Sequence, residues 1–300
     1  MPELPDVTVY VESLEKRLVG RVLDRVSLKS PFFLRTFDHP IEVIEGQEVL
    51  GVRRIGKRIV FEFDDELFLV FHLMVAGRFR WKDQAKAKLG GKIVLATFKF
   101  PNGSLFVTEA SKKKRASLHL VKGEDALSEM NPGGLEVLEA SIDQFAERLR
   151  LRNHTLKRAL SDPKLFSGIG NAYSDEILNV VGLSPLALSQ KLSDEDVAAL
   201  FDGTKKVLSD WTDRLRNDFA DRFPGAGEIT AFRPDFSVHG QYGNPCKRCG
   251  TTVQRIRYAE NETNYCPNCQ TGGKILSDRS LARLLKDDWP KTVEELEYGN

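Results

Sequence analysis

The residues with the clearest chemical potential stand at the amino terminus, in Met1-Pro2-Glu3-Leu4-Pro5. If the initiator methionine is removed, Pro2 carries a secondary amine with the Glu3 carboxylate beside it. Such an amine titrates near the ordinary α-amino pKa of about 7.7–8, so a useful fraction is neutral and nucleophilic at cellular pH. A plainer interpretation is that these residues only lead an extended chain into the first helix. Five positions alone do not separate the two.

The four cysteines form a second group with chemical meaning. They occur as two Cys-x-x-Cys pairs separated by sixteen residues, at Cys246, Cys249, Cys266 and Cys269. Two such pairs place four thiolates at the tips of two turns, as a tetrahedral zinc site requires. Two disulfides are the poorer explanation for a cytosolic chain, whose compartment keeps thiols reduced. Because the protein supplies all four ligands, the zinc would fold a small module and would not take part in catalysis.

Length, composition and net charge limit the possible domain number, location and partners of the chain. The chain has 300 residues, of which 41% are hydrophobic, so we expect about two domains with real cores. It has no apolar run long enough to span a membrane and no basic-then-apolar secretion signal, so a cytoplasmic location is expected. A net charge of +1 neither requires nor excludes a nucleic-acid partner. Any such partner would have to bind local basic surface.

The first half of the sequence is mostly β in pattern. One amphipathic helix is expected over 6–18, with Gly20 as its stop. Short strand-like runs follow, separated by turn residues such as Pro101-Asn102-Gly103. They cover 21–29, 48–55, 57–63, 67–73, 91–100 and 105–109. Many short strands without intervening helices indicate an antiparallel sandwich or barrel.

Three basic features of this half have two interpretations each. In the run 57–63, alternation puts Lys57 on the face of Ile59 and Phe61, where it either reaches out to solvent or looks into a cleft. His72 ends an apolar run and is either a packed residue or a functional one. The run Ser111-Lys112-Lys113-Lys114-Arg115 is either a solvated loop or a set of phosphate contacts.

After a linker at 131–134 the pattern becomes helical, with expected helices near 142–149, 155–160, 172–181 and 194–218. Between the second and third lies the loop 161–171. Its glycines, Gly168 and Gly170, permit tight turns and leave amides exposed just before a helix, which suits an anionic oxygen. A simple turn between helices is the alternative. No strand precedes these glycines, so a dinucleotide fold is not indicated.

Together these motifs resemble the bacterial formamidopyrimidine-DNA glycosylase / endonuclease VIII family. The resemblance spans nearly the whole chain and rests on five motifs in the same order and spacing. They are Pro2-Glu3-Leu4-Pro5, Lys57, His72-Leu73 with Gly77, the stretch from Leu156-Lys157 through Gly168-Ile169-Gly170-Asn171 to Leu178, and Pro245-Cys246 to Gln270.

The resemblance implies a multidomain α+β protein. Its parts would be an N-terminal antiparallel β-sandwich (2–125), a helix–two-turn–helix domain (135–225), a four-cysteine zinc finger (236–271) and a C-terminal extension (272–300). It implies a monomer that clamps double-stranded DNA carrying a damaged base or abasic site. It also implies one structural zinc, and a cytoplasmic location in association with the bacterial nucleoid.

The resemblance further implies a bifunctional glycosylase and abasic-site lyase. The damaged nucleotide must leave the duplex before chemistry can reach it. Pro2 would then attack the sugar to form an iminium, while Glu3 acts as acid and base and Lys57 assists near the phosphate. The DNA-binding residues carried over from the family are His72, Lys157, Gly170 and Asn171.

The sequence also departs from the family pattern. Family members fill the gap left by the flipped base with Met, Arg and Phe, but here the first position reads Val75 or Met74. The loop that should carry the other two reads 109–115, Glu-Ala-Ser-Lys-Lys-Lys-Arg. The finger arginine is replaced by Asn261, for which Arg255 or Arg257 could substitute only if the hairpin folds differently. The tail beyond Gln270 is expected to hold a short amphipathic helix marked by Leu276, Leu281, Leu284 and Leu285, before Trp289-Pro290. This helix either packs on the domain or serves as a docking segment.

Two functions remain open on this evidence. The first is a working glycosylase/lyase with an altered lesion range, supported by Pro2, Glu3, Lys57 and Asn171. The second is a protein of the same fold that binds damaged or abasic DNA with weak or no turnover, supported by the lost wedge and finger arginine.

Overall fold

The computed structural model describes residues 1–85, 87–258, 261–277, 283–286 and 289–298. Their contacts divide the chain into two compact units. Unit 1 comprises residues 1–132 and 211–230, and unit 2 comprises residues 133–210 and 231–300. Within the described ranges, no helix is both long and apolar enough to cross a membrane.

Unit 1 begins with helix α1, Leu4–Leu18. Pro5 stands in its first turn, where a missing N–H costs nothing, and Asp6 accepts a hydrogen bond from the Glu3 amide at 3.0 Å. Lys16 and Arg17 in the last turn complement the helix dipole. The buried face of α1, which includes Tyr10 and Leu14, joins the main core.

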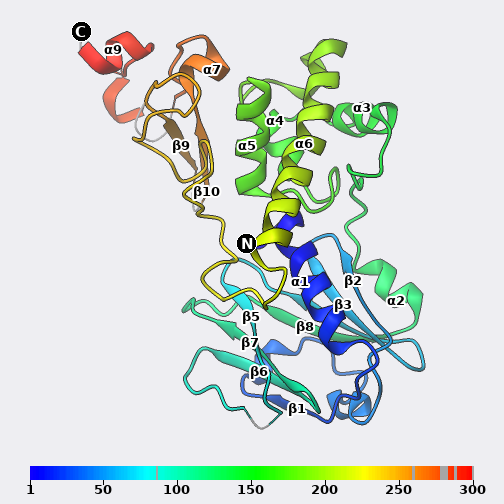
Figure 1. Cartoon of the computed structure of the whole chain (residues 1–300). Coiled ribbons are helices and arrows are strands. Elements are labelled where there is room, and N and C mark those ends of the chain that lie inside the picture. Colours follow the sequence, from blue (N-terminus) through cyan, green and yellow to red (C-terminus); the bar gives the residue numbers. More distant parts are fainter. Residues whose placement is uncertain (86, 259–260, 278–282, 287–288, 299–300) are drawn as a thin grey trace. The chain divides into compact units, whose positions relative to one another are not determined.

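Two four-stranded antiparallel sheets follow, in the orders β1-β6-β7-β5 and β2-β3-β4-β8 (Figure 1). The strands are β1 (Arg25–Leu28), β2 (Gly51–Ile55), β3 (Arg58–Phe63), β4 (Leu67–His72), β5 (Gly77–Lys82), β6 (Val94–Phe100), β7 (Gly103–Glu109) and β8 (Ser117–Lys122). The expected antiparallel β-sandwich is therefore confirmed.

The main core of unit 1 lies between these sheets. Phe71 packs edge-on against Phe79 and Phe98, which brings strands of both sheets together. The strands β3 and β4 are apolar on both faces because their second face is also covered. There Val60 and Phe68 pack with Leu127 of the short helix α2 (Glu124–Glu129). Two 3₁₀ turns, η1 (Pro31–Phe33) and η2 (Ile41–Ile44), complete this unit.

Unit 2 contains the helices α3 (Ile142–Arg150), α4 (Leu156–Ser161), α5 (Asn171–Val181), a 3₁₀ turn η3 (Ser189–Lys191) and the first part of α6 (Asp194–Asp218). Ser141 caps α3, because its hydroxyl oxygen accepts a hydrogen bond from the Gln144 backbone amide at 3.3 Å. The Gln144 side chain in turn accepts from the Ser141 backbone amide. Gly182 ends α5 at φ 73°, a conformation that favours glycine.

The carboxyl-terminal part of unit 2 is a small hairpin with a tail. The hairpin strands are β9 (Gln254–Tyr258) and β10 (Asn261–Tyr265), followed by α7 (Pro267–Thr271). The tail returns to the hairpin, since the Leu276 amide donates to the Tyr265 hydroxyl at 2.7 Å. Two backbone hydrogen bonds fold the tail back on itself: the Ile275 amide donates to the Lys291 carbonyl oxygen, and the Val293 amide donates to the Gly273 carbonyl oxygen. Val293 is the first residue of the helix α9 (Val293–Tyr298).

Several expected elements need correction. Lys57 does not begin a strand; it lies in the Gly56-Lys57 turn, which Gly56 makes at φ 58°. The strands β5 and β8 and the helix α2 were not anticipated. In the tail, Leu276 lies in the returning segment, Leu281 is outside the described residues, and Leu284 is 76% exposed. Residues 283–285, which include Leu284 and Leu285, are helical and precede Trp289-Pro290 as expected, and a further helix, α9, follows them.

Candidate active site and metal centre

The amino terminus of unit 1 is enclosed, and charged groups of both signs lie near it. Pro2 and Glu3 are both buried at the start of α1. Burial lowers the pKa of the Met1 amino group, and the charges of Arg78 and Lys57 lower it further, against the opposing effect of Glu3 and Asp6. An amine at this point therefore favours its neutral, nucleophilic form.

Lys57 and His72 belong to one end of the sandwich. Arg58 of β3 pairs with His72 of β4, which pairs in turn with Ser117 of β8. Only four residues separate His72 from Gly77, the first residue of β5, so the second sheet begins at the same end. We call this end, which holds Arg58, His72, Gly77 and the following turns, the His72 end.

The electrostatic surroundings of His72 consist of cations. Burial lowers its pKa to about 4, and Arg58, Lys57 and His119 act in the same direction. His119 lies near its Ser117 neighbour, with Nε2 3.2 Å from the hydroxyl oxygen, and burial together with Arg58 lowers its pKa as well. A phosphate placed here would meet the positive charges of Arg58 and Lys57, and its negative charge would oppose their lowering of the His72 pKa.

The turn from Leu73 to Gly77 is held tightly. Arg78 donates to the carbonyl oxygens of Val75 at 3.0 Å and Gly77 at 2.6 Å. Val75 itself is 61% exposed, and Met74 takes a positive φ of 51°. The position where the family pattern has Met thus presents an exposed apolar side chain on a rigid turn.

The loop after β7 contains no large apolar side chain. Buried Glu109 accepts from the amides of Arg115 at 3.0 Å and Ala116 at 3.2 Å, and Lys114 donates to its carbonyl oxygen. The side chains of Lys112 and Lys113 are exposed. Glu109 therefore fixes the base of a loop whose outer surface is cationic.

In unit 2, the loop before α5 differs from its expected form. Residues 165–170 are all buried, because Leu165, Phe166 and Ile169 anchor the loop in apolar surroundings. Gly170 is the N-cap of α5, and Asn171 is half-buried at the first helical position. The Asn171 amide group donates to the carbonyl oxygen of Glu262 in β10 at 2.9 Å. This bond uses one of its two N–H donors, and the second remains a candidate for a phosphate.

Lys157 is the residue whose place differs most from its proposed DNA contact. Its ammonium is buried and donates to Asp175 Oδ1 at 2.6 Å and to the Asn171 carbonyl oxygen at 2.5 Å. The other oxygen of Asp175 lies 2.7 Å from His239 Nδ1 and accepts from the Asn264 amide at 3.1 Å. Asp175 thus joins α4, α5, the segment before the hairpin, and the hairpin itself.

A neighbouring carboxylate strengthens the same junction. Glu176 accepts from the backbone amides of Ser237, Val238 and His239 at 2.7–2.9 Å. Burial still raises the pKa of Glu176. Asn179 and Gln270 add a bond of 3.1 Å between α5 and α7. Helix α5 and the hairpin are therefore one packed body.

The four cysteines fit a zinc ion. Their sulfur atoms all lie within 4.8 Å of one another, with Cys249 Sγ 3.4 Å from Cys266 Sγ and 3.5 Å from Cys269 Sγ. Tetrahedral Zn–S bonds of about 2.3 Å require sulfur separations of about 3.8 Å. All four cysteines are free thiols without disulfides. The chain therefore holds one structural zinc, bound by Cys246, Cys249, Cys266 and Cys269.

The finger arginines are partly committed elsewhere. Arg255 donates to Glu262 at 3.2 Å and lies 4.1 Å above the Tyr242 ring. Asn261, which opens β10, is exposed. Arg257 pairs in register with Glu262 on the opposite strand and is exposed. Of the two proposed substitutes, Arg257 is the more exposed.

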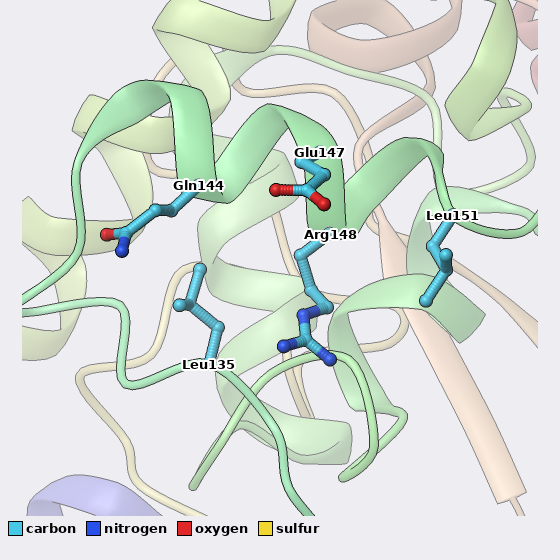
Figure 2. Close-up of a pocket in the computed structure, with 5 residues that line it drawn as sticks. All are labelled: Leu135, Gln144, Glu147, Arg148 and Leu151. Atoms are coloured by element: carbon cyan, nitrogen blue, oxygen red, sulfur yellow. The ribbon is translucent and has the colours of Figure 1, made fainter.

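A separate hollow of about 370 Å³ in unit 2 holds none of these residues. Figure 2 shows it between α3 and the preceding segment. Its lining mixes both charges with apolar groups: Leu135, Gln144, Glu147, Arg148 and Leu151. It offers no convergent set of catalytic groups, so the candidate site remains with the amino terminus.

Sequence reasoning missed Arg78, Arg58 and the Asp175–His239 pair. Arg78 follows the motif glycine Gly77, but nothing in the sequence connects it with the amino terminus. His239 is an isolated histidine, and its partner lies 64 positions away. Only the packed structure brings these groups together.

Comparison with known proteins gives consistent matches along the chain. The formamidopyrimidine-DNA glycosylase N-terminal domain matches residues 1–116, and the H2TH domain of that glycosylase matches 134–213. The zinc finger found in FPG and IleRS matches 243–272. Residues 273–300 lie beyond the last of these matches.

Individual relatives agree with the domain matches. The formamidopyrimidine-DNA glycosylase of Heliobacterium modesticaldum is 30% identical over 277 residues, which cover 90% of this chain and all of that protein. An uncharacterized formamidopyrimidine-DNA glycosylase-like protein of Mycobacterium tuberculosis is 40% identical over 153 residues, or 51% of this chain and 94% of the relative. The Lactococcus lactis Fpg in complex with DNA containing an abasic site is 26% identical, with a TM-score of 0.79 over 90% of this chain and 99% of that one.

Proposed function

The chain belongs to the formamidopyrimidine-DNA glycosylase family, and we propose that Pro2 is the nucleophile with which it excises damaged bases. The protein is thus a base-excision repair enzyme, a DNA glycosylase with abasic-site lyase activity. Work on chromosomal DNA would associate it with the nucleoid. The observation that carries the role of Pro2 is its burial beside Glu3, at a terminus where burial lowers the pKa of the amino group and so favours a neutral amine.

The chemistry follows from these neighbours. The Pro2 nitrogen forms a bond to the sugar C1′ carbon, and the damaged base leaves with a proton that Glu3 supplies. The ring-opened sugar is then joined to Pro2 as an iminium, which acidifies the C2′ protons. Removal of one such proton expels the 3′ phosphate, and Lys57 offsets the negative charge of the leaving group. Water regenerates the free amine.

Phosphate binding divides between the two units. In unit 1 we assign it to His72, with Lys57 and Arg58 beside it. In unit 2 we assign it to the first turn of α5, through Asn171 and the backbone at Gly170. Lys157 stabilises the position of Asn171, because its buried ammonium donates a hydrogen bond to the Asn171 carbonyl oxygen.

Borohydride trapping on an abasic-site duplex tests the role of Pro2. We expect the methionine-processed protein to give a covalent adduct, and peptide mapping to place that adduct on Pro2. An amino-terminal extension that puts Pro2 in a tertiary amide should abolish base excision, as should Pro2→Gly. Pro5→Ala is the matched control, because it removes a nearby proline and leaves the terminal amine intact.

An adduct on a lysine, or full base excision by the extended protein, would contradict the proposal. Tight binding of the abasic duplex without any adduct would instead support a damage-binding role with weak turnover. The cationic loop 110–115 and Asn261, where the family has Arg, are the features that favour this second function.

A further inference from the structure

A basic hollow lies in unit 1, apart from the residues assigned above. It has a volume of about 590 Å³, and three lysines from three separate segments line it: Lys29, Lys92 and Lys114. The other described residues that line it are Ser30, Leu89, Gly90, Gly91, Val94 and Leu95, none of which carries a carboxylate. In a chain with a net charge of only +1, three ammonium groups around one hollow form a concentrated positive field.

The three segments are held in place by backbone bonds. The Lys29 and Ser30 amides donate to the Leu95 carbonyl oxygen at 2.8 and 3.1 Å. The Glu109 amide donates to the Ile93 carbonyl oxygen at 2.8 Å, and Lys114 donates to the Glu109 carbonyl oxygen. Backbone hydrogen bonds therefore fix the segments that form the hollow to the end of the sheet, while the three lysine side chains are exposed to solvent.

Two of its lysines remain available to a ligand. Among the residues that the structure describes, neither Lys29 nor Lys92 has an ion-pair or hydrogen-bond partner for its ammonium group. Gly90 and Gly91 precede Lys92, and a Cβ added at either glycine would meet no atom within 4 Å. The wall beside Lys92 is consequently open to an incoming group.

Strand register places this hollow at the His72 end of the sandwich. Glu109, the last residue of β7, pairs with Gly77, the first residue of β5. On the other side of β7, β6 begins at Val94, and its Ala96 pairs with Leu28, the last residue of β1. All of these strand termini therefore share the end that carries His72 and the turn before Gly77, which Arg78 connects to the amino terminus.

We propose that the Lys29–Lys92–Lys114 hollow is a second phosphate-binding subsite, which takes a backbone phosphate of the DNA flanking the damaged nucleotide. The proposal rests on the proposed function, because DNA is the polyanion that the same end of the sandwich engages. A phosphate there would be held by point charges without base contacts, so the subsite adds affinity and not sequence preference.

The test compares two charge-matched double variants. Lys29→Ala/Lys92→Ala removes two ammonium groups at the hollow and leaves Lys114, which supports the loop, in place. Lys16→Ala/Lys122→Ala removes two ammonium groups at the end of the sandwich opposite the His72 end. There Lys122 pairs in register with Leu67, and the carbonyl oxygen of Arg17 accepts from Asn102 of the β6–β7 turn. Thermal unfolding confirms that both variants fold.

The measurement is the affinity for an abasic-analogue duplex over a series of salt concentrations. For one lost phosphate contact, the slope of log affinity against log salt becomes shallower by about 0.9, and the affinity at about 0.1 M salt falls about five- to tenfold. We expect this change in the hollow variant and not in the control. Equal affinities and slopes in the two variants would overturn the proposal.

A second arm separates DNA from free anions. Acylation of Lys29 and Lys92, followed by peptide mapping, should be slowed by the duplex. Protection by inorganic phosphate at matched ionic strength, without protection by the duplex, would show a free-anion site and overturn the proposal. Borohydride trapping at saturating duplex should be equal in both variants, so a failure of the Pro2 chemistry would be seen independently of the salt slope.

Discussion

His72 is a residue whose charge state follows from its neighbours. Its pKa of about 4, against an ordinary value of 6.5, means that the folded protein favours the neutral imidazole. Between these two pH values the unfolded chain binds more protons than the folded one. Stability therefore rises with pH across this window, and the contribution of His72 is lost as pH falls through it.

We expect the free energy of unfolding to fall between pH 6.5 and 4, with His72 responsible for an amount on the order of 2 kcal/mol. Denaturant unfolding of His72→Gln at several pH values measures this amount, since the variant should lose less stability on acidification. His39→Gln controls for removing a histidine elsewhere in unit 1. If His72→Gln and the native protein had parallel pH profiles, the imidazole would not be held neutral.

For Lys157, the sequence predicted the position of the residue but not the direction of its side chain. The sequence placed it before a glycine loop and near an expected ligand, and its ammonium does lie beside that loop. The ammonium, however, is buried against Asp175 and the Asn171 carbonyl oxygen. The sequence motif therefore placed Lys157 near the correct loop. The direction of its side chain depends on the Asp175–His239 pair, which forms only in the packed structure.

At the scale of elements, hydrophobic periodicity located most of the fold. The helix α6 has the predicted bounds 194–218, and most expected strands differ from the observed ones only at their ends. The two missed strands had weaker signals. In β5, charged residues alternate with Phe79 and Trp81, and β8 follows directly on a basic run. Lys57 was misplaced because Gly56 at positive φ ends β2 and makes a turn where continuous alternation suggested a strand.

The turn between β4 and β5 depends on Gly77. A Cβ at this position would clash with the Leu73 carbonyl oxygen, which also accepts the Gly77 amide bond of 2.8 Å. We expect Gly77→Ala to lower the free energy of unfolding by about 2 kcal/mol, because rigid backbone cannot give way. It should also slow base excision, since the same turn follows His72 and is bound by Arg78.

Gly227→Ala is the matched control, because it also lies in unit 1 and a Cβ there meets no atom within 4 Å. Chemical denaturation and single-turnover excision compare the two variants. An unchanged Gly77→Ala protein would mean that the turn can rearrange without cost.

At the scale of the whole molecule, the zinc module and the sandwich belong to different compact units. Zinc holds the hairpin whose Glu262 carbonyl oxygen receives the Asn171 amide group and whose Asn264 binds Asp175. Loss of the metal should therefore release the first turn of α5, to which we assign phosphate binding, while unit 1 has its own core.

We expect Cys249→Ser to weaken binding of an abasic duplex at least tenfold while the sandwich stays folded, with tenfold the order of magnitude that disturbing a metal site commonly costs. Metal analysis establishes the zinc content, anisotropy gives the affinity, and calorimetry shows whether the transition of unit 1 persists. Thr252→Ala is a neighbouring control that keeps all four sulfur ligands and the hydrogen bond between Cys249 and Thr251. Undiminished affinity after verified zinc loss would refute a role of the finger in DNA binding.

The burial of Pro2 also bears on the timing of maturation. The bond between Met1 and Pro2 leads directly into a buried residue and the first turn of α1. The burial of Pro2 leaves a peptidase little access to this bond in the folded protein. Removal of the initiator methionine therefore belongs to the nascent chain on the ribosome, before α1 docks, and a molecule that folds first keeps its nucleophile locked in an amide bond.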